Sequence, residues 1–245
     1  MERDWLEWCR FRQNFSAKAL AVSGNNLYAA GNSYVSKWNG TNWLSLGSVM
    51  RQGGSSADVF ALAVSGNDLY VGVFFTVAGG SPANYITKWN GSSWSALNAG
   101  MNGIVSVLAV SGTVLYAGGN FTTAGGSPAV FIAKWDGNRW SGLGSGSLTG
   151  SGINSGVSAL AVSGSNLYVG GYFTTVDGTA ATNIAKWDGC SWSALSSGID
   201  GRVRALAVSG SDLYAGGQFS YQQAVFRPLV SPDGTGAFGV RSARA

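Results

Sequence analysis

The chain has 245 residues, of which 45% are hydrophobic and 11% are charged, and its formal net charge is +4. This apolar content excludes general disorder, and no apolar run reaches the ~18 residues that span a bilayer, so we expect no membrane insertion. The chain contains no histidine, which excludes a Ser-His-Asp triad and a His-ligated copper or zinc centre. No basic run interleaves with aromatic residues, so we expect no nucleic-acid partner.

The N-terminal segment, residues 1–16, does not follow the pattern of the rest of the chain. It lacks the apolar stretch of a secretory signal peptide, so the sequence by itself assigns no cellular compartment. Cys9 in this segment and the distant Cys190 are the two cysteines of the chain, too few for a disulfide framework or a cysteine zinc site.

Residues 17–220 are built from one repeated phrase. ALAVSGNNLY at 19–28 returns with small changes at 61–70, 107–116, 159–168 and 205–214. Successive copies begin 42 to 52 residues apart, a period typical of stacked repeat units. We place the repeats at about 17–58, 59–104, 105–156, 157–202 and, as a partial copy, 203–220.

Each complete repeat predicts four antiparallel strands. In the second repeat these are residues 61–64, 69–74, 85–89 and 94–97, separated by a Ser-Gly turn, a looser Gly-Gly-Ser-Pro segment and an Asn-Gly hairpin. Four-stranded units at this spacing are typical of β-propeller blades, which cover one another around an axis. The predicted fold class is therefore all-β, a β-propeller of about five blades; the alternative is an open fragment of a six- or seven-bladed ring.

Paired tryptophans flank the last hairpin of the first four repeats. A position repeated in every blade favours packing between blades over sugar stacking, because burial of ~200 Å² per ring contributes about 5 kcal/mol as an upper estimate. The repeated lysines before these hairpins are expected to carry solvated head groups on apolar stems. The tryptophans are Trp38/Trp43, Trp89/Trp94, Trp135/Trp140 and Trp187/Trp192, and the lysines are Lys37, Lys88, Lys134 and Lys186.

Several phrases carry a family resemblance. LYAGG at 115–119, KWDG at 134–137 and Trp140 stand in the order of the kelch repeat of galactose-oxidase-like propellers, which the chain resembles, although Trp stands where kelch repeats usually have Tyr. Two further phrases resemble propeller repeats of large bacterial surface and secreted proteins: GGNFTTAGGSPA at 118–129 and GGYFTTVDGTAA at 170–181. The resemblance implies a propeller fold and an extracellular or cell-surface location, and it implies nothing about the ligand.

Variation among the repeats points to a binding face. The first and third turns are nearly uniform, whereas the second turns and the links between repeats vary, and variable loops on a rigid scaffold concentrate binding residues. We therefore expect ligand contacts at the residues that begin the third strand and at arginines of the links. These are Tyr34, Tyr85, Phe131 and Asn183, with Arg51, Arg202 and Arg204.

These features favour a non-catalytic binding or structural module that contacts a protein or a glycan. We expect no catalytic residue, no bound metal and no cofactor. One alternative is a glycosidase or lyase acting on polysaccharide with carboxylates on the variable face, from Asp58, Asp177 and Asp200. A remnant without function is another. Unpaired blade edges would favour self-association.

The two ends predict a reading-frame error. After Phe219 the expected Lys-Trp-Asp-Gly does not follow, yet codons allowed from the third base of Gln222 permit AGGVPATGIARWDGSVWSALGSG, in register with 78–100. A shifted reading of residues 1–13 permits WSGTGWSGVGSG, which parallels 135–146. We predict that both ends are frameshifted repeat sequence and that 1–15 and 221–245 pack loosely. A five-bladed ring could close if the N-terminal segment added a strand beside 206–219.

Overall fold

The computed structural model describes residues 17–31, 33–47, 50–52, 55–144, 153–220, 223–229 and 237–242, the last two ranges by backbone alone. Over these residues the chain is all-β, as predicted. It divides into two compact units, Met1–Leu97 and Asn98–Ala245. In the part of the chain that the structure describes, no helix is long and apolar enough to cross a membrane.

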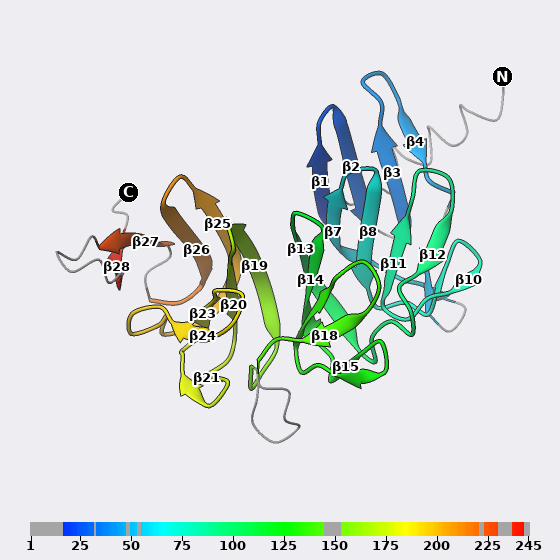
Figure 1. Cartoon of the computed structure of the whole chain (residues 1–245). Coiled ribbons are helices and arrows are strands. Elements are labelled where there is room, and N and C mark those ends of the chain that lie inside the picture. The colour runs from blue at the N-terminus through cyan, green and yellow to red at the C-terminus, as the bar shows by residue number, and fades with distance from the viewer. Residues whose placement is uncertain are drawn as a thin grey trace. The chain divides into compact units, whose positions relative to one another are not determined.

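Two of the four-stranded antiparallel sheets of unit 1 are the first two predicted blades (Figure 1). Blade 1 consists of β1 (Ala19–Ser23), β2 (Asn26–Gly31), β3 (Tyr34–Trp38) and β4 (Trp43–Ser45). Blade 2 consists of β7 (Val59–Ser65), β8 (Asp68–Val73), β11 (Ile86–Trp89) and β12 (Trp94–Ala96). A small sheet of β5 (Arg51–Gln52), β6 (Ser55–Ser56), β9 (Val77–Ala78) and β10 (Ser81–Pro82) joins the link between the blades to the second turn of blade 2.

Unit 2 contains three further four-stranded sheets in chain order, blades 3 to 5 (Figure 1). Blade 3 consists of β13 (Ile104–Ser111), β14 (Val114–Asn120), β17 (Ile132–Trp135) and β18 (Trp140–Gly142). Blade 4 consists of β19 (Val157–Ser163), β20 (Asn166–Gly171), β23 (Ile184–Trp187) and β24 (Trp192–Ala194). Blade 5 consists of β25 (Arg202–Ser209), β26 (Asp212–Gln218), β27 (Gln223–Leu229) and β28 (Ala237–Ser242).

The second turns are more regular than the loose segment that the sequence suggested. They form short hairpins, β15 (Thr123–Ala124) with β16 (Ser127–Pro128) in blade 3, and β21 (Thr175–Val176) with β22 (Thr179–Ala180) in blade 4. Gly125 and Gly126 turn the first of these with φ of 59° and 83°, a backbone that glycine adopts without steric cost. The hairpins also bridge the preceding links, since Ala124 pairs with Met101 and Val176 with Ile153.

The repeated phrase packs blade 4 on both of its neighbours. Leu160 in β19 is 8% exposed and shares a core cluster with Tyr116 of blade 3. Ala159 and Ala161 of the same strand share a cluster with Leu213 of blade 5. Alternation along the strand therefore sends leucine toward the preceding blade and small alanines toward the following one, which confirms the two-faced pattern of the phrase.

Within each unit, tryptophans pack at the boundary between blades, as predicted. Trp187 and Trp192 are 6% and 9% exposed and belong to the cluster that joins blades 3 and 4. The Trp192 indole Nε1 donates a hydrogen bond to the Leu143 carbonyl across that boundary at 3.4 Å. In unit 1, Trp94 of blade 2 donates in the same way to the Leu46 carbonyl of blade 1 at 3.0 Å.

Blade 5 corrects one expectation about the chain ends. The strand beside β26 is β27, in which Phe226 pairs with Leu213, and not a strand of the N-terminal segment. Residues 223–229 and 237–242 form paired strands, with β28 pairing with β27 from Ala237 to Ser242, and the expectation that 221–245 pack loosely stays a prediction. The expectation for 1–15 lies outside the described residues, and the frameshift hypothesis itself stays a prediction.

Candidate functional site

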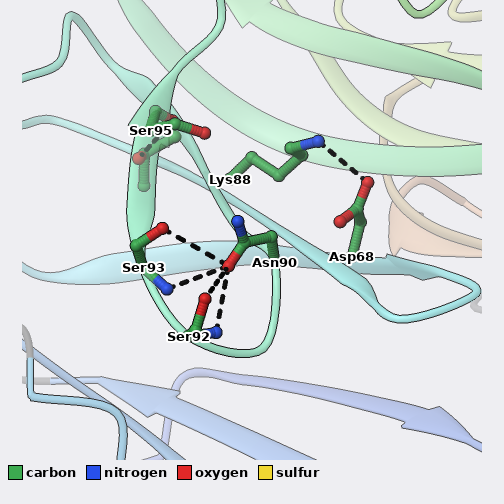
Figure 2. Close-up of polar contacts among 7 residues, drawn as sticks. Asp68, Lys88, Asn90, Ser92, Ser93 and Ser95 are labelled. Atoms are coloured by element: carbon green, nitrogen blue, oxygen red, sulfur yellow. Dashed lines mark hydrogen bonds and ion pairs between the residues drawn. The ribbon is translucent and has the colours of Figure 1, made fainter.

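The end of each blade that carries the first and third turns, here called the turn end, is saturated with local hydrogen bonds. Figure 2 shows blade 2, where the Asn90 side-chain oxygen accepts the backbone amides of Ser92 and Ser93 at 3.0 and 2.9 Å. In blade 4, Asp188 accepts the amides of Cys190 and Ser191 at 2.9 and 2.8 Å. These turns need Asn or Asp to satisfy two backbone donors, so their uniformity is structural.

The repeated lysines are held along the second strands near this end. Lys88 forms an ion pair with Asp68 at 3.0 Å (Figure 2), and the Lys37 ammonium lies 5.8 Å from the centre of the Tyr28 ring. Burial raises the pKa of Tyr70, and the nearby Asp68 carboxylate raises it further. Tyr70 therefore stays neutral at neutral pH.

The opposite end of each blade, here called the strand-start end, is where the first strand begins and the second strand finishes. Its links are clamped to the second turns by asparagine. The Asn102 side-chain oxygen accepts the amides of Thr122 and Thr123 at 2.8 and 2.9 Å, and Asn154 does the same for Thr174 at 2.9 Å in the next blade. These hydrogen bonds attach each link to the second turn of its blade, and they do not involve the variable residues of the link.

Three of the predicted contact residues share an unusual backbone at the strand-start end. Tyr85, Phe131 and Asn183 immediately precede the third strand of their blades with φ of 61°, 61° and 62°. Asn183 suits that left-handed conformation and is 5% exposed. Its side chain donates to the Ile199 carbonyl at 2.8 Å and accepts the Phe173 amide at 3.0 Å. Asn183 is therefore a structural residue, whose burial does not fit the expected ligand contact.

Tyr85 and Phe131 are half-buried, and Phe131, in unit 2, packs against the core cluster that joins blades 3 and 4. The remaining predicted residues are exposed. Tyr34 begins β3 and is 48% exposed. Arg51 is exposed in β5, where its backbone pairs with Val77. Arg202 and Arg204 are exposed at the start of β25. The structure brings Arg202 and Arg204 together in unit 2, whereas Tyr34, Tyr85 and Arg51 belong to unit 1.

A set of residues of which the sequence pattern indicates only Arg204 lies at a β-bulge of the strand-start end. In blades 2 to 5 the register between the first and second strands shifts by one residue just before the repeated phrase. A bulge leaves one residue unpaired and re-aims its side chain. We call this set the bulge row, and it includes the equivalent position of blade 1: Lys18, Phe60, Ser106, Ser158 and Arg204. The signal in the sequence is that this position changes in side-chain class while the phrase after it does not.

In unit 1 the bulge row consists of an aromatic residue, Phe60, and a lysine, Lys18, whose charge is balanced by a nearby carboxylate. Phe60 is 46% exposed, and the Lys18 ammonium lies 5.2 Å from the centre of its ring. Lys18 also forms an ion pair with Asp58. At the end of β8, Phe74 is 43% exposed and its ring centre lies 5.8 Å from that of Tyr85. Exposed aromatic groups of this kind supply contact area to a partner at low entropic cost.

In unit 2 the same positions are polar and basic. The Arg202 guanidinium donates to the Ser158 hydroxyl of blade 4 at 3.2 Å, and the Arg204 guanidinium donates to the Gln218 side-chain oxygen at 2.8 Å. Tyr172 at the end of blade 4 is 65% exposed. Over the described residues of the chain, no group of three or more potential metal-ligating side chains was found.

Comparison with solved structures places this architecture. A structure of the mitotic checkpoint complex aligns with 91% of this chain and 62% of that one, with a TM-score of 0.59 and 16% identity. The WD40 β-propeller domain of Doa1 aligns over 94% of this chain and 74% of its own, with a TM-score of 0.54 and 17% identity. The chain is a β-propeller. The structure of YCF48 bound to the D1 peptide also aligns with this propeller. The alignment covers 93% of this chain and 68% of that one, with a TM-score of 0.53 and 15% identity.

These likenesses establish the fold alone. The five blades observed match the repeat number predicted from the sequence. No model of a known family matches the chain, and no curated protein matches it. The propeller covers only 59% of the computationally designed Ika8 protein and 62% of the chain matched in the mitotic checkpoint complex. The relation to kelch repeats stays a prediction.

Proposed function

We propose that the protein is a non-catalytic binding module that engages a peptide or protein with the strand-start end of its blades. The observation that carries the proposal is the bulge row, where side chains differ between blades although the strands that hold them do not. A bulge leaves its extra residue out of the strand pairing and re-aims the side chain, so the residue there can be specialised for contact. YCF48, which shares the fold, is seen bound to a peptide.

The aromatic cluster in unit 1 is the best contact surface for such a partner. Phe60 and Phe74 are each more than two-fifths exposed, and Phe60 follows the buried Val59. Aromatic anchors dominate binding energy at protein interfaces. Blade 3 carries serine and asparagine at the same two positions, Ser106 and Asn120, so the architecture of a blade does not require aromatic groups there.

The test is selection of a phage-displayed random peptide library on the immobilised full chain. Selected peptides are then compared on wild type and on the double variant Phe60→Ser/Phe74→Asn, which installs the residues of blade 3. We expect the variant to bind at least about tenfold more weakly, since hot-spot truncation costs ~2 kcal/mol or more. The matched control is Leu44→Ser, which removes another exposed apolar side chain at a position where blades 2 to 4 have serine.

The outcomes separate clearly. Binding that falls in the double variant and persists in the Leu44→Ser control supports the proposal. Failure to enrich any peptide, or enrichment that the double variant retains in full, would overturn it. Binding to a glycan array in place of peptides would overturn the choice of partner.

A further inference from the structure

Resting on the proposed function, we infer that the strand-start end of unit 2 binds a carboxylate of an acidic peptide segment with Arg202 and Arg204. Both guanidinium groups are exposed at the beginning of β25. Their spacing of two residues along a strand would place both on one face, and the bulge between Val203 and Ala205 sets Arg204 apart from regular pairing. The pair is therefore built into the blade rather than carried by a loop.

The partners of the two arginines are uncharged. Arg202 reaches across to Ser158 of blade 4, and Arg204 is held by Gln218 of its own blade. Over the described residues, no ion pair involves either guanidinium. A guanidinium has five N–H donors in a rigid fork, so one neutral acceptor orients it and leaves donors for a planar carboxylate.

The nearest acidic residue along the chain is committed to the backbone. Asp200, two positions before Arg202, accepts the Ser220 amide at 3.1 Å. Hydrogen bonds from Ser220 lower the pKa of the Asp200 carboxyl. Asp200 thus fills the role that Asn102 and Asn154 fill in blades 3 and 4, where an asparagine oxygen accepts the equivalent amides.

Unit 1 supplies an internal precedent for a carboxylate beside this row. Lys18 occupies the bulge-row position of blade 1, as Arg204 does in blade 5. Its ion-pair partner is Asp58, at the beginning of blade 2. Asp58 in the second repeat and Arg202 in the fifth repeat occupy equivalent positions, three residues before Ala61 and Ala205. Lys18 thus has a carboxylate partner within the chain, whereas Arg204 has the neutral side chain of Gln218. A carboxylate of a bound peptide would give Arg204 the equivalent ion pair.

Polar and aromatic neighbours suit a peptide rather than an isolated anion. Tyr172 is 65% exposed at the end of the strand that pairs with β19, the strand that carries Ser158. Asn120 and Gln218 are exposed at the equivalent ends of blades 3 and 5. A tyrosine ring with amide groups on either side can pack against and hydrogen-bond an extended backbone.

The experiment extends the library selection. It repeats the selection on Arg202→Gln/Arg204→Ser, in which serine is the residue of blades 3 and 4 at the Arg204 position. It also measures binding of fluorescent hexaglutamate and hexalysine to the full chain by polarisation at low and at physiological ionic strength. The control variant is Arg139→Ser, which removes a highly exposed arginine at the turn end and matches Ser93 and Ser191.

We expect Asp and Glu to be enriched in peptides selected on wild type and the enrichment to disappear on the double variant. We expect hexaglutamate to bind wild type and Arg139→Ser equally and the double variant at least about tenfold more weakly, with weaker binding at higher salt. If Arg139→Ser lost as much hexaglutamate affinity as the double variant, the effect would be one of net charge alone, and the inference would be overturned. Peptides that bind but lack acidic residues would overturn the inference and leave the proposed function standing.

Discussion

The two ends of each blade obey different rules. At the turn end, the same side-chain type makes the same bonds in every complete repeat, as Asn90 and Asp188 do with the two amides that follow them. At the strand-start end, the bulge row changes from lysine to phenylalanine to serine to arginine. The difference teaches that side chains that accept backbone amides are held constant, because their loss removes two hydrogen bonds of the turn, whereas the bulge-row side chains are free to change.

In blade 5 the sequence of the turn end differs from that of the other four blades. Phe226 pairs with Leu213 where Trp187 pairs with Leu167 in blade 4. The sheet still has four strands, because ladder hydrogen bonds use the backbone and accept most side chains. The Trp-Asp-Gly turn and its paired tryptophans are missing from the sequence there.

The largest expected effect comes from restoring the turn end of blade 5. Replacing residues 222–244 by AGGVPATGIARWDGSVWSALGSG returns the hairpin and two tryptophans in the register of blade 2. Since a tryptophan in a core is worth about 3–5 kcal/mol, we expect the free energy of unfolding to rise by about 3 kcal/mol or more in urea titrations. A shuffled segment of the same composition is the control.

That replacement also tests the frameshift hypothesis. An unchanged or lower unfolding midpoint would show that the present C-terminal strands already pack as well as a standard blade. The coding DNA gives an independent test, because codons incompatible with the shifted readings at either end would end the hypothesis.

The next largest effect contrasts one aromatic residue from each end of blade 4. Trp192 is 9% exposed and hydrogen-bonded to Leu143, whereas Tyr172 is 65% exposed. We expect Trp192→Ala to cost about 3–5 kcal/mol of unfolding free energy and Tyr172→Ala to change it by less than ~0.5 kcal/mol. Similar costs in urea melts would break the distinction between a structural and a variable end.

A smaller and opposite effect is expected at the second turn of blade 1. Ser33 has φ of 73°, is 1% exposed, and its hydroxyl has no hydrogen-bond partner among the described residues. Ser33→Gly removes both the strained backbone and the unsatisfied hydroxyl, so we expect a gain of about 1 kcal/mol in thermal and urea unfolding. Ser33→Ala keeps the strain and removes only the hydroxyl, and it should gain less. A loss in the glycine variant would contradict this account.

The smallest effect is pH dependence from acids that satisfy backbone amides. Backbone hydrogen bonds lower the pKa of Asp136 and Asp188, and hydrogen bonds from Ser220 lower that of Asp200. A carboxyl with a lowered pKa in the folded state stabilises the fold fully above its unfolded pKa of ~3.9, and this contribution is lost as the pH falls through the folded pKa.

The matched variant is Asp136→Asn/Asp188→Asn/Asp200→Asn, because other repeats carry Asn90 and Asn102 in these roles. We expect its urea midpoint at neutral pH to stay close to wild type and its decline in acid to be shallower. An equally steep decline below pH ~4 would assign the acid sensitivity to other groups.

Much of the fold could be predicted from the repeat. The period, the Asn-Gly hairpins and the alternation of leucine and alanine all follow from local rules that a β-strand obeys wherever it lies. The tryptophans were correctly assigned to packing for the same reason. The candidate site was predicted less well, because Asn183 looks like a loop residue in sequence and becomes a buried clamp only through Ile199 and Phe173.

The sequence by itself determined the all-β class, the blade number and the end of each blade that varies, because repeats reveal which positions must be constant. Tertiary structure alone decided which variable residues project outward. The bulge before Ala61 and Ala205 is a one-residue register shift between strands, and no local pattern encodes a shift that depends on how two strands pair. It also decided that Arg202 meets Ser158 of the neighbouring blade, because that contact exists only once blades have stacked.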